Sequence, residues 1–121
     1  MLSKILYVDD EYPNRVMFKL AYRDELDIIL AESADEGLSL MKSNPDISFV
    51  ITDMRMPHKD GLQFVSEARA LNNEIPYCLL TGFGLTPEIQ DALDSNLIDQ
   101  YFKKPFEKNK ILSFIQEKLN F

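Results

Sequence analysis

Five short apolar runs, separated by stretches with helical spacing, constrain the fold of this chain more than any other feature. Runs of this length, rich in β-branched and aromatic residues, are typical of strands buried on both faces. They lie at Ile5–Val8, Ile28–Ala31, Phe49–Ile51, Tyr77–Leu80 and Leu97–Phe102. Because strands that alternate with helices form right-handed βαβ units, the pattern predicts an α/β fold, a parallel sheet within a three-layer α/β/α sandwich.

The stretches between the runs carry recognisable helix starts and ends. Ser33 and Glu36 have the spacing of a capping box, a third helix is expected to begin near Gly61, and Thr86-Pro87 suits the start of a fourth. Asn96 tolerates the left-handed conformation that ends many helices. Pro13 is suited to open the first helix, whose expected inward residues are Val16, Met17, Leu20 and Ala21. The last helix is expected to bury Leu112, Ile115 and Leu119, with Ile111 and Phe114 at the core edge or on a partner surface.

Length and composition indicate one domain, residues 1–121, with a single cysteine, Cys78, expected to be a buried thiol. One cysteine cannot form an internal disulfide, which suits the cytoplasm. No apolar stretch approaches the roughly 20 residues of a membrane span. Thirteen basic and twenty acidic side chains give a net charge of −7 at pH 7. That balance argues against nucleic acid or an anionic membrane as a direct partner, because phosphate binding needs a basic surface.

Acidic residues follow two of the predicted strands. Asp9, Asp10 and Glu11 come after the first, and Asp53 ends the third. The carboxyl ends of parallel strands meet at one edge of the sheet, where open α/β sheets place their sites. Two negative charges about 4 Å apart repel by about 4 kcal/mol at an effective dielectric of about 20, so the cluster needs a cation. Hard carboxylate ligands without a histidine or cysteine cluster favour Mg²⁺.

The same edge is expected to carry a hydroxyl and an ammonium group. Thr81 ends the fourth strand, and Lys103 and Lys104 end the fifth. Beside a metal-held phosphoryl group, the Asp53 carboxylate could attack phosphorus to form an aspartyl phosphate. Thr81 and Lys104 would then supply a hydrogen bond and a positive charge to the phosphoryl oxygens.

Each of these residues, taken singly, also has an ordinary explanation. Asp53 could be a turn or helix-cap acid, the acids after the first strand a solvated turn, and Thr81 a strand-end residue. Tyr101 could be a core aromatic, and His58 is expected to be an exposed loop residue, with a metal or phosphodonor role as the alternative. Only the joint placement of the acids, the hydroxyl and the amine at one edge favours a site.

The chain resembles the receiver domain of two-component response regulators, of the chemotaxis-regulator kind, over essentially its whole length. The resemblance is carried in chain order by Asp9-Asp10, Asp53 with Pro57 and Gly61, Thr81-Gly82, Tyr101, and Lys104-Pro105-Phe106. Each motif is weak alone, but the ordered set is specific. The resemblance implies a flavodoxin-like sheet of strand order 2-1-3-4-5.

The resemblance also implies roles for the rim residues. Asp53 would be the phosphoacceptor, receiving its phosphoryl group from a sensor histidine kinase or a phosphotransfer protein. Asp10 and Asp53 would bind Mg²⁺ directly, Asp9 would act through a water, and the backbone carbonyl of Arg55 would complete the protein ligands. Lys104, the lysine that directly precedes the proline, would contact the phosphoryl group, and the bond to that proline would be cis.

Thr81 and Tyr101 would form the switch pair of such a domain. Phosphorylation would change partner binding through the surface of the fourth helix, fifth strand and fifth helix. The domain would be a regulatory phosphoacceptor that catalyses only its own phosphorylation and dephosphorylation. Phe83 and Arg55 lie two places after Thr81 and Asp53, at positions that tune phosphoryl lifetime in similar proteins. The output partner, and whether phosphorylation drives homodimer formation, stay open.

Three other functions compete with this interpretation. A haloacid-dehalogenase-like phosphatase also uses a strand-end aspartate, but it needs a second aspartate where this chain has Arg55. A flavodoxin-like electron carrier must cradle a flavin phosphate in its first loop, which Asp9 and Asp10 would repel. A pseudo-receiver that binds partners without phosphate is the third, and the completeness of the site argues against it.

Overall fold

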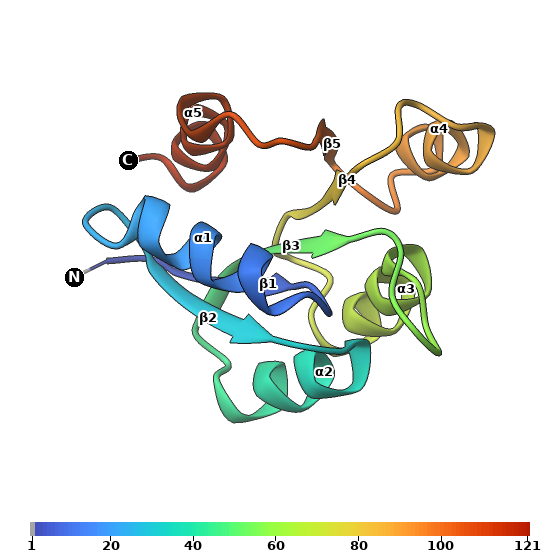
Figure 1. The fold of residues 1–121 in the computed structure, drawn as a ribbon. Helices are drawn as coiled ribbons and strands as arrows, with labels where there is room; N and C mark the ends of the chain where they lie inside the picture. The colour runs from blue at the N-terminus through green and yellow to red at the C-terminus, as the bar shows by residue number, and fades with distance from the viewer. Residues whose placement is uncertain (1) are drawn as a thin grey trace.

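The computed structural model describes residues 2–121, in which five strands and five helices alternate strictly (Figure 1). Their bounds are β1 Lys4–Val8, α1 Tyr12–Tyr22, β2 Asp27–Ala31, α2 Ala34–Ser43, β3 Ile47–Asp53, α3 Gly61–Leu71, β4 Tyr77–Thr81, α4 Pro87–Asp94, β5 Gln100–Lys103 and α5 Lys108–Leu119. The predicted alternation is confirmed. In this part of the chain no helix combines the length and the apolar character that a membrane span requires.

The five strands form one parallel sheet in the order β2-β1-β3-β4-β5. The predicted sheet and its strand order are therefore confirmed. β3 lies at the centre, between β1 and β4, and all of its residues except Ser48 are buried. A strand covered on both faces reads as a continuous apolar run, which is why β3 carries no alternation of polar and apolar residues.

Helices cover both faces of the sheet and create two cores. α1 and α5 lie on one face, and α2, α3 and α4 lie on the other (Figure 1). Because side chains of a strand alternate between faces, β1 sends Ile5 and Tyr7 to the first core and Leu6 and Val8 to the second. The three-layer α/β/α sandwich is thus confirmed.

The inward face of α1 differs from the prediction. Of the four residues expected to face the core, Met17 and Leu20 are 61% and 56% exposed. Phe18 and Tyr22 are fully buried instead. The Phe18 ring stacks on Tyr7 of β1, with centroids 4.1 Å apart and an angle of 11° between the planes. Aromatic rings bury the largest apolar area, so this contact decides how the helix is rotated against the sheet.

The fifth strand begins at Gln100 and not at Leu97. The backbone N–H groups of Leu97 and Ile98 both donate to the carbonyl of Ala92 in α4, at 2.9 and 3.2 Å, so they close the helix and do not pair with β4. Ile98 is nevertheless buried, which explains the apolar run. Asn96 has a φ of 61°, as predicted for the helix end.

The core face of α5 also differs in part from the prediction. Ile111 and Ile115 are fully buried, so Ile111 belongs to the core and not to its edge. Leu112, Phe114 and Leu119 are partly buried and pack against the same core. The helix is rotated so that two β-branched residues, one turn apart, point at the sheet.

Side-chain caps fix where α2 and α3 begin. At α2 the Ser33 hydroxyl accepts from the N–H of Glu36 at 3.1 Å, whereas the Glu36 carboxylate accepts from Glu32 at 2.9 Å and not from Ser33. The predicted capping box is therefore only half formed. A complete box occurs at α3, where Asp60 and Gln63 each accept from the other's backbone N–H at 2.8 Å. This capping box fixes the end of the loop that connects Asp53 to α3.

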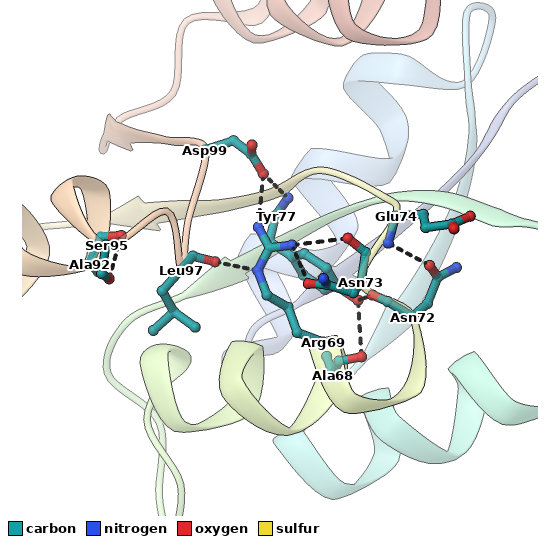
Figure 2. A network of polar contacts seen from close by, with 10 residues as sticks. All are labelled: Ala68, Arg69, Asn72, Asn73, Glu74, Tyr77, Ala92, Ser95, Leu97 and Asp99. Carbon is teal, nitrogen blue, oxygen red and sulfur yellow. Dashed lines mark hydrogen bonds and ion pairs between the residues drawn. The ribbon is translucent and has the colours of Figure 1, made fainter.

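A polar network around Arg69 fastens the amino-terminal edge of the sheet, as Figure 2 shows. The guanidinium donates to the carbonyl of Leu97 at 2.7 Å, to the side chain of Asn73 at 3.2 Å, and to the carboxylate of Asp99 at 3.2 Å. It also lies 4.7 Å above the ring centroid of Tyr77. One side chain of α3 thus holds the start of β4 and the connection from α4 to β5.

The Arg69 network makes a testable contribution to stability. Arg69→Lys keeps the charge but loses the planar fork of donors, so the free energy of unfolding should fall by about 1–2 kcal/mol. The same exchange at Arg23, which is exposed at the end of α1, should leave the stability unchanged. Urea denaturation of both variants measures the difference. Equal stabilities would contradict a structural role for the fork.

Candidate functional site

Four strands deliver polar side chains to the carboxyl edge of the sheet. Asp9 and Asp10 follow β1, Asp53 is the last residue of β3, and Thr81 is the last residue of β4. Lys104 follows the end of β5, whose last residue pairs with Thr81. The structure therefore brings together the acids, the hydroxyl and the amine that the sequence indicated.

The three aspartates form a compact cluster. One oxygen of each of Asp9, Asp10 and Asp53 can be chosen so that all three lie within 4.8 Å of one another. Asp9 is completely buried and Asp53 is 6% exposed, whereas Asp10 is exposed to solvent. Burial weakens the screening of charge by water, so the three carboxylates repel strongly in the absence of a cation.

Lys104 supplies one positive charge to this cluster. Its Nζ lies 3.2 Å from Oδ2 of Asp9 and 3.4 Å from Oδ2 of Asp53. The peptide bond between Lys104 and Pro105 is cis, and the N–H of Lys104 donates to the carbonyl of Thr81 at 2.7 Å. The structure thus places Lys104, and not the exposed Lys103, against the acids.

The pKa values of the site reflect burial and charge. Burial raises the pKa of the Asp53 carboxyl, the Lys104 ammonium opposes that rise, and the Asp9 carboxylate adds to it. Burial acts to lower the pKa of Lys104, but the carboxylates of Asp53 and Asp9 outweigh burial, and the pKa lies above its ordinary value. One ammonium therefore does not offset the cost of keeping the Asp53 carboxylate charged.

Two residues that hold Asp9 were not singled out from the sequence. The Tyr7 hydroxyl donates to Oδ2 of Asp9 at 2.6 Å, and the Asn14 amide donates to the same oxygen at 3.2 Å. Tyr7 precedes Asp9 by two positions, and the period of two along a strand places such residues on the same face. That spacing is the signal that could have identified Tyr7. Asn14 lies on α1, and no pattern in the sequence sets its distance from Asp9.

The loops that follow β3 and β4 contact each other. Thr81 is 1% exposed, and its hydroxyl oxygen accepts from the N–H of Phe83 at 3.1 Å. The guanidinium carbon of Arg55 lies 4.6 Å from the centroid of the Phe83 ring, in a cation–π contact. The two positions that the resemblance associated with phosphoryl lifetime are therefore in contact with each other.

A cavity lies next to Thr81, between these two loops and the start of α4. Its volume is about 230 Å³, and its lining includes Met54, Thr81 and Ile89. Tyr101, the other member of the predicted switch pair, does not line it. Tyr101 is half-buried against the core beneath α3 and α4 and borders a separate hollow beside Glu107. The cavity gives the Thr81 side chain and its loop room to move.

Gly61 is required by the close approach of two backbone segments. A Cβ atom at this position would overlap the carbonyl oxygen of Asp53 and press on Cα of Met54. The N–H of Gly61 donates to the carbonyl of Met54 at 2.8 Å. The start of α3 is thereby fixed directly behind Asp53, as the predicted helix start at Gly61 requires.

Two residues weighed from the sequence lie away from this cluster's contacts. His58 is an exposed loop residue with a φ of 70°. Cys78 is fully buried, and burial raises the pKa of its thiol well above the ordinary value. His58 is thus the exposed loop residue that the sequence predicts, and Cys78 is the predicted buried thiol.

The donor set fits a hard divalent cation. Three carboxylates converge, two of them are largely withdrawn from water, and one lysine leaves the group with net negative charge. Oxygen ligands of this kind suit Mg²⁺, which binds through one or two carboxylates and keeps several waters. The role of the Arg55 backbone carbonyl as a metal ligand stays a prediction.

The fold and the edge cluster define a class of regulatory signalling domain. The family model for the response regulator receiver domain matches residues 5–116. The chain belongs to this family. Receiver domains act in two-component phosphorelays as switches and not as enzymes in the ordinary sense, bind Mg²⁺ at an acidic site, and interact with histidine kinases or phosphotransfer proteins and with output partners.

Relatives of known function support this membership. Chemotaxis protein CheY1 of Helicobacter pylori is 36% identical over 110 residues, which cover 85% of this chain and 86% of that protein. Transcriptional regulatory protein FixJ of Bradyrhizobium diazoefficiens is 28% identical over 104 residues, which cover 79% of this chain. The chain spans half or less of the length of the transcriptional regulators that it matches.

A solved structure adds to the comparison. Response regulator TrrA of Thermotoga maritima, crystallised in complex with Mg²⁺ and beryllium fluoride, superposes with a TM-score of 0.82 at 27% identity, covering 96% of this chain and 98% of that one. Membership in the receiver family sets aside the flavodoxin-like carrier and the haloacid-dehalogenase-like phosphatase.

The raised pKa of Asp53 predicts how stability depends on pH. The folded metal-free protein binds the Asp53 proton more tightly than the unfolded chain, so stability is lost as pH rises from about 3.8 through the folded pKa. Asp53→Asn removes this loss. The variant should melt at a higher temperature than the parent protein at pH 7 without metal, and the gain should vanish in acid.

Asp46→Asn is the matched control for that measurement. A hydrogen bond from Lys4 lowers the pKa of Asp46, so its carboxylate contributes stability above its ordinary pKa. This substitution should lower the melting temperature at pH 7 or leave it unchanged. A lower melting temperature for Asp53→Asn than for the parent protein would contradict the charge strain assigned to the cluster.

Proposed function

We propose that this chain is a phosphorylation-dependent signalling switch, with Asp53 as the phosphoacceptor and residues 1–121 as the receiver domain. The observation that carries the proposal is the placement of Asp53. Its carboxylate ends the central strand, 6% exposed, beside two further aspartates and 3.4 Å from the ammonium of Lys104. We infer a cytoplasmic setting, since the donor is a histidine kinase or a phosphotransfer protein.

The proposed reaction is a transfer of a phosphoryl group from a phosphohistidine. A carboxylate oxygen of Asp53 forms a bond to phosphorus while the phosphorus–nitrogen bond of the donor breaks. The electron pair of that bond returns to the imidazole, which leaves neutral because its other nitrogen keeps a proton. The product is an aspartyl phosphate. Water later attacks the phosphorus, the bond from phosphorus to the Asp53 oxygen breaks, and inorganic phosphate leaves, which restores the carboxylate. The domain thus catalyses only its own phosphorylation and dephosphorylation.

The chain's own residues would bind the metal and balance charge during the transfer. Asp10, Asp53 and the backbone carbonyl of Arg55 would hold Mg²⁺ directly, and Asp9 would hold it through a water. When bound, Mg²⁺ offsets the charge that gathers on the phosphoryl oxygens. Lys104 already contacts Asp53, and its ammonium would move onto a phosphoryl oxygen.

The contact between Arg55 and Phe83 would shield the aspartyl phosphate from water. The Phe83 side chain is 53% exposed, and the guanidinium of Arg55 covers one face of its ring at 4.6 Å. Arg55 and Phe83 lie in the loops that directly follow Asp53 and Thr81. Removing the ring would admit water to the edge of the sheet, so this contact would set the lifetime of the phosphorylated state.

The covalent step can be tested directly. With Mg²⁺ and acetyl phosphate, the protein should gain one acid-stable, base-labile phosphoryl group, detected by mass spectrometry of the intact chain. Asp53→Asn should gain none, because an amide is a far poorer nucleophile than a carboxylate. Asp46→Asn, an exposed exchange of the same kind, should be labelled like the parent protein. A parent protein that stays unlabelled would indicate a pseudo-receiver, and labelling of Asp53→Asn would place the acceptor elsewhere.

We infer that Thr81 couples Asp53 to the surface of α4, β5 and α5, where the output partner would bind. The Thr81 hydroxyl oxygen accepts from Phe83, which leaves its O–H free to donate to a phosphoryl oxygen. A move of Thr81 toward Asp53 would therefore pull the β4–α4 loop with it. The space that this opens would allow Tyr101 to turn inward, because a close-packed core favours discrete arrangements. A phosphorylation-dependent homodimer, if one forms, would use the surface that this movement of Thr81 and Tyr101 alters.

The coupling predicts a difference between two substitutions at one site. Beryllofluoride with Mg²⁺ mimics a phosphoryl group and should shift backbone amide resonances across residues 82–106. Thr81→Ala should still accept a phosphoryl group but lose most of the distant shifts, since it has no hydroxyl. Thr81→Ser keeps the hydroxyl and should retain them. Distant shifts that survive in Thr81→Ala would show that the change travels by another route.

A further inference from the structure

The two oxygens of the buried Asp9 carboxylate have unequal surroundings. Oδ2 accepts three hydrogen bonds, from the Tyr7 hydroxyl at 2.6 Å, the Asn14 amide at 3.2 Å and the Lys104 ammonium at 3.2 Å. Oδ1 accepts from the backbone N–H of Glu11 at 3.0 Å. An ionised carboxylate offers about two lone-pair sites on each oxygen. Oδ2 is therefore fully used by protein donors, and the open position of Asp9 lies on Oδ1.

The packing of the Tyr7 ring fixes the shortest of these bonds. The ring is 1% exposed and stacks on Phe18 with centroids 4.1 Å apart. Tyr7 lies in β1, two positions before Asp9, so strand and ring together define where the hydroxyl can be. Burial and the neighbouring carboxylate raise the pKa of this phenol, so it is a donor at neutral pH. Asn14 approaches the same oxygen from α1.

We propose that Tyr7, supported by Asn14, is a positioning residue for the metal site that holds Asp9 in the orientation Mg²⁺ requires. This inference rests on the proposed function. The hydroxyl occupies Oδ2, so that Oδ1 is presented to the ion or to one of its waters. Hydrogen bonds to groups around a metal orient the ligands in this way, and their loss typically weakens metal binding by about 10–100-fold.

The same arrangement leaves Lys104 free to change partner. When its ammonium moves from Asp9 to a phosphoryl oxygen on Asp53, Oδ2 of Asp9 keeps two donors. Without Tyr7 and Asn14 that move would leave a fully buried carboxylate oxygen without a hydrogen bond, at a substantial cost in free energy. The positioning residues therefore stabilise Asp9 both before and after phosphorylation.

Titration of the unphosphorylated protein with Mg²⁺ alone, by calorimetry, tests the proposal. Tyr7→Phe should raise the dissociation constant for Mg²⁺ about tenfold, the lower end of the effect of such contacts. Tyr22→Phe is the matched control. Like Tyr7, Tyr22 is a buried tyrosine whose hydroxyl donates a hydrogen bond, but it lies on α1 and its acceptor is the carbonyl of Lys108, at 3.0 Å, and not a carboxylate of the cluster. It should leave Mg²⁺ affinity unchanged, even where melting in EDTA shows that both variants lose stability.

Two further variants show whether Tyr7 acts through Asp9. In an Asp9→Asn background, Tyr7→Phe should no longer change the dissociation constant. Asn14→Ala removes a donor to the same oxygen from a partly exposed position, so it should raise the dissociation constant for Mg²⁺ by a smaller factor. If Tyr7→Phe does not fold, this variant tests whether hydrogen bonds to Oδ2 of Asp9 support Mg²⁺ binding. Failure of the parent protein to bind Mg²⁺ would overturn the proposed function. A parent protein that binds Mg²⁺ no more tightly than Tyr7→Phe, or an undiminished effect in the Asp9→Asn background, would overturn this inference alone.

Discussion

Mutual repulsion among three carboxylates at one edge of the sheet is the constraint on which the rest of the structure depends. Asp9 and Asp53 are almost completely removed from water, Asp10 lies beside them, and Lys104 is the ammonium that contacts the buried pair. Two unit negative charges about 4 Å apart repel by about 4 kcal/mol at an effective dielectric of about 20, and exposure of Asp10 to solvent weakens its share of the repulsion. A cluster of this kind persists only where the surrounding structure holds it, and its charge creates the affinity for a cation.

The buried, apolar sheet holds the three aspartates close together despite their repulsion. β3 is covered on both faces, and a shift of its register by one residue would move each of its buried side chains into the opposite core, so Asp53 is fixed at the end of this strand. Asp9 is held through its main chain as well, since its N–H donates to Ala31 at the end of β2 and its carbonyl accepts from Arg15 of α1 at 2.9 Å. Burial on both sides of the sheet thus opposes the repulsion at its edge.

The parts of the fold and of the site that the sequence predicted are those that depend on residues close together in the chain. Asp53 and Thr81 each end an apolar run, and a change from apolar to polar residues at a strand end is visible without any knowledge of packing. The inward side of α1 and the start of β5 were missed because they depend on distant contacts: Phe18 faces inward because it meets Tyr7, and Leu97 leaves the strand because it closes α4. The spacing of two between Tyr7 and Asp9 already places both on one face of β1, whereas the contact from Asn14 to Asp9 depends on how α1 packs, so it became visible only with the structure.

The two edges of the sheet differ in how completely their charges are satisfied. At the amino-terminal edge the Arg69 guanidinium has hydrogen-bond partners on Leu97, Asn73 and Asp99, so that edge has little to gain from rearrangement (Figure 2). At the carboxyl edge carboxylates outnumber ammonium groups, and a cavity lies beside Thr81. A change of charge at Asp53 therefore acts on the edge that is electrostatically unbalanced and bordered by a cavity. Arg69 of α3 holds the connection between α4 and β5 at the opposite edge. A structural change caused by phosphorylation of Asp53 is therefore expected to involve the β4–α4 loop.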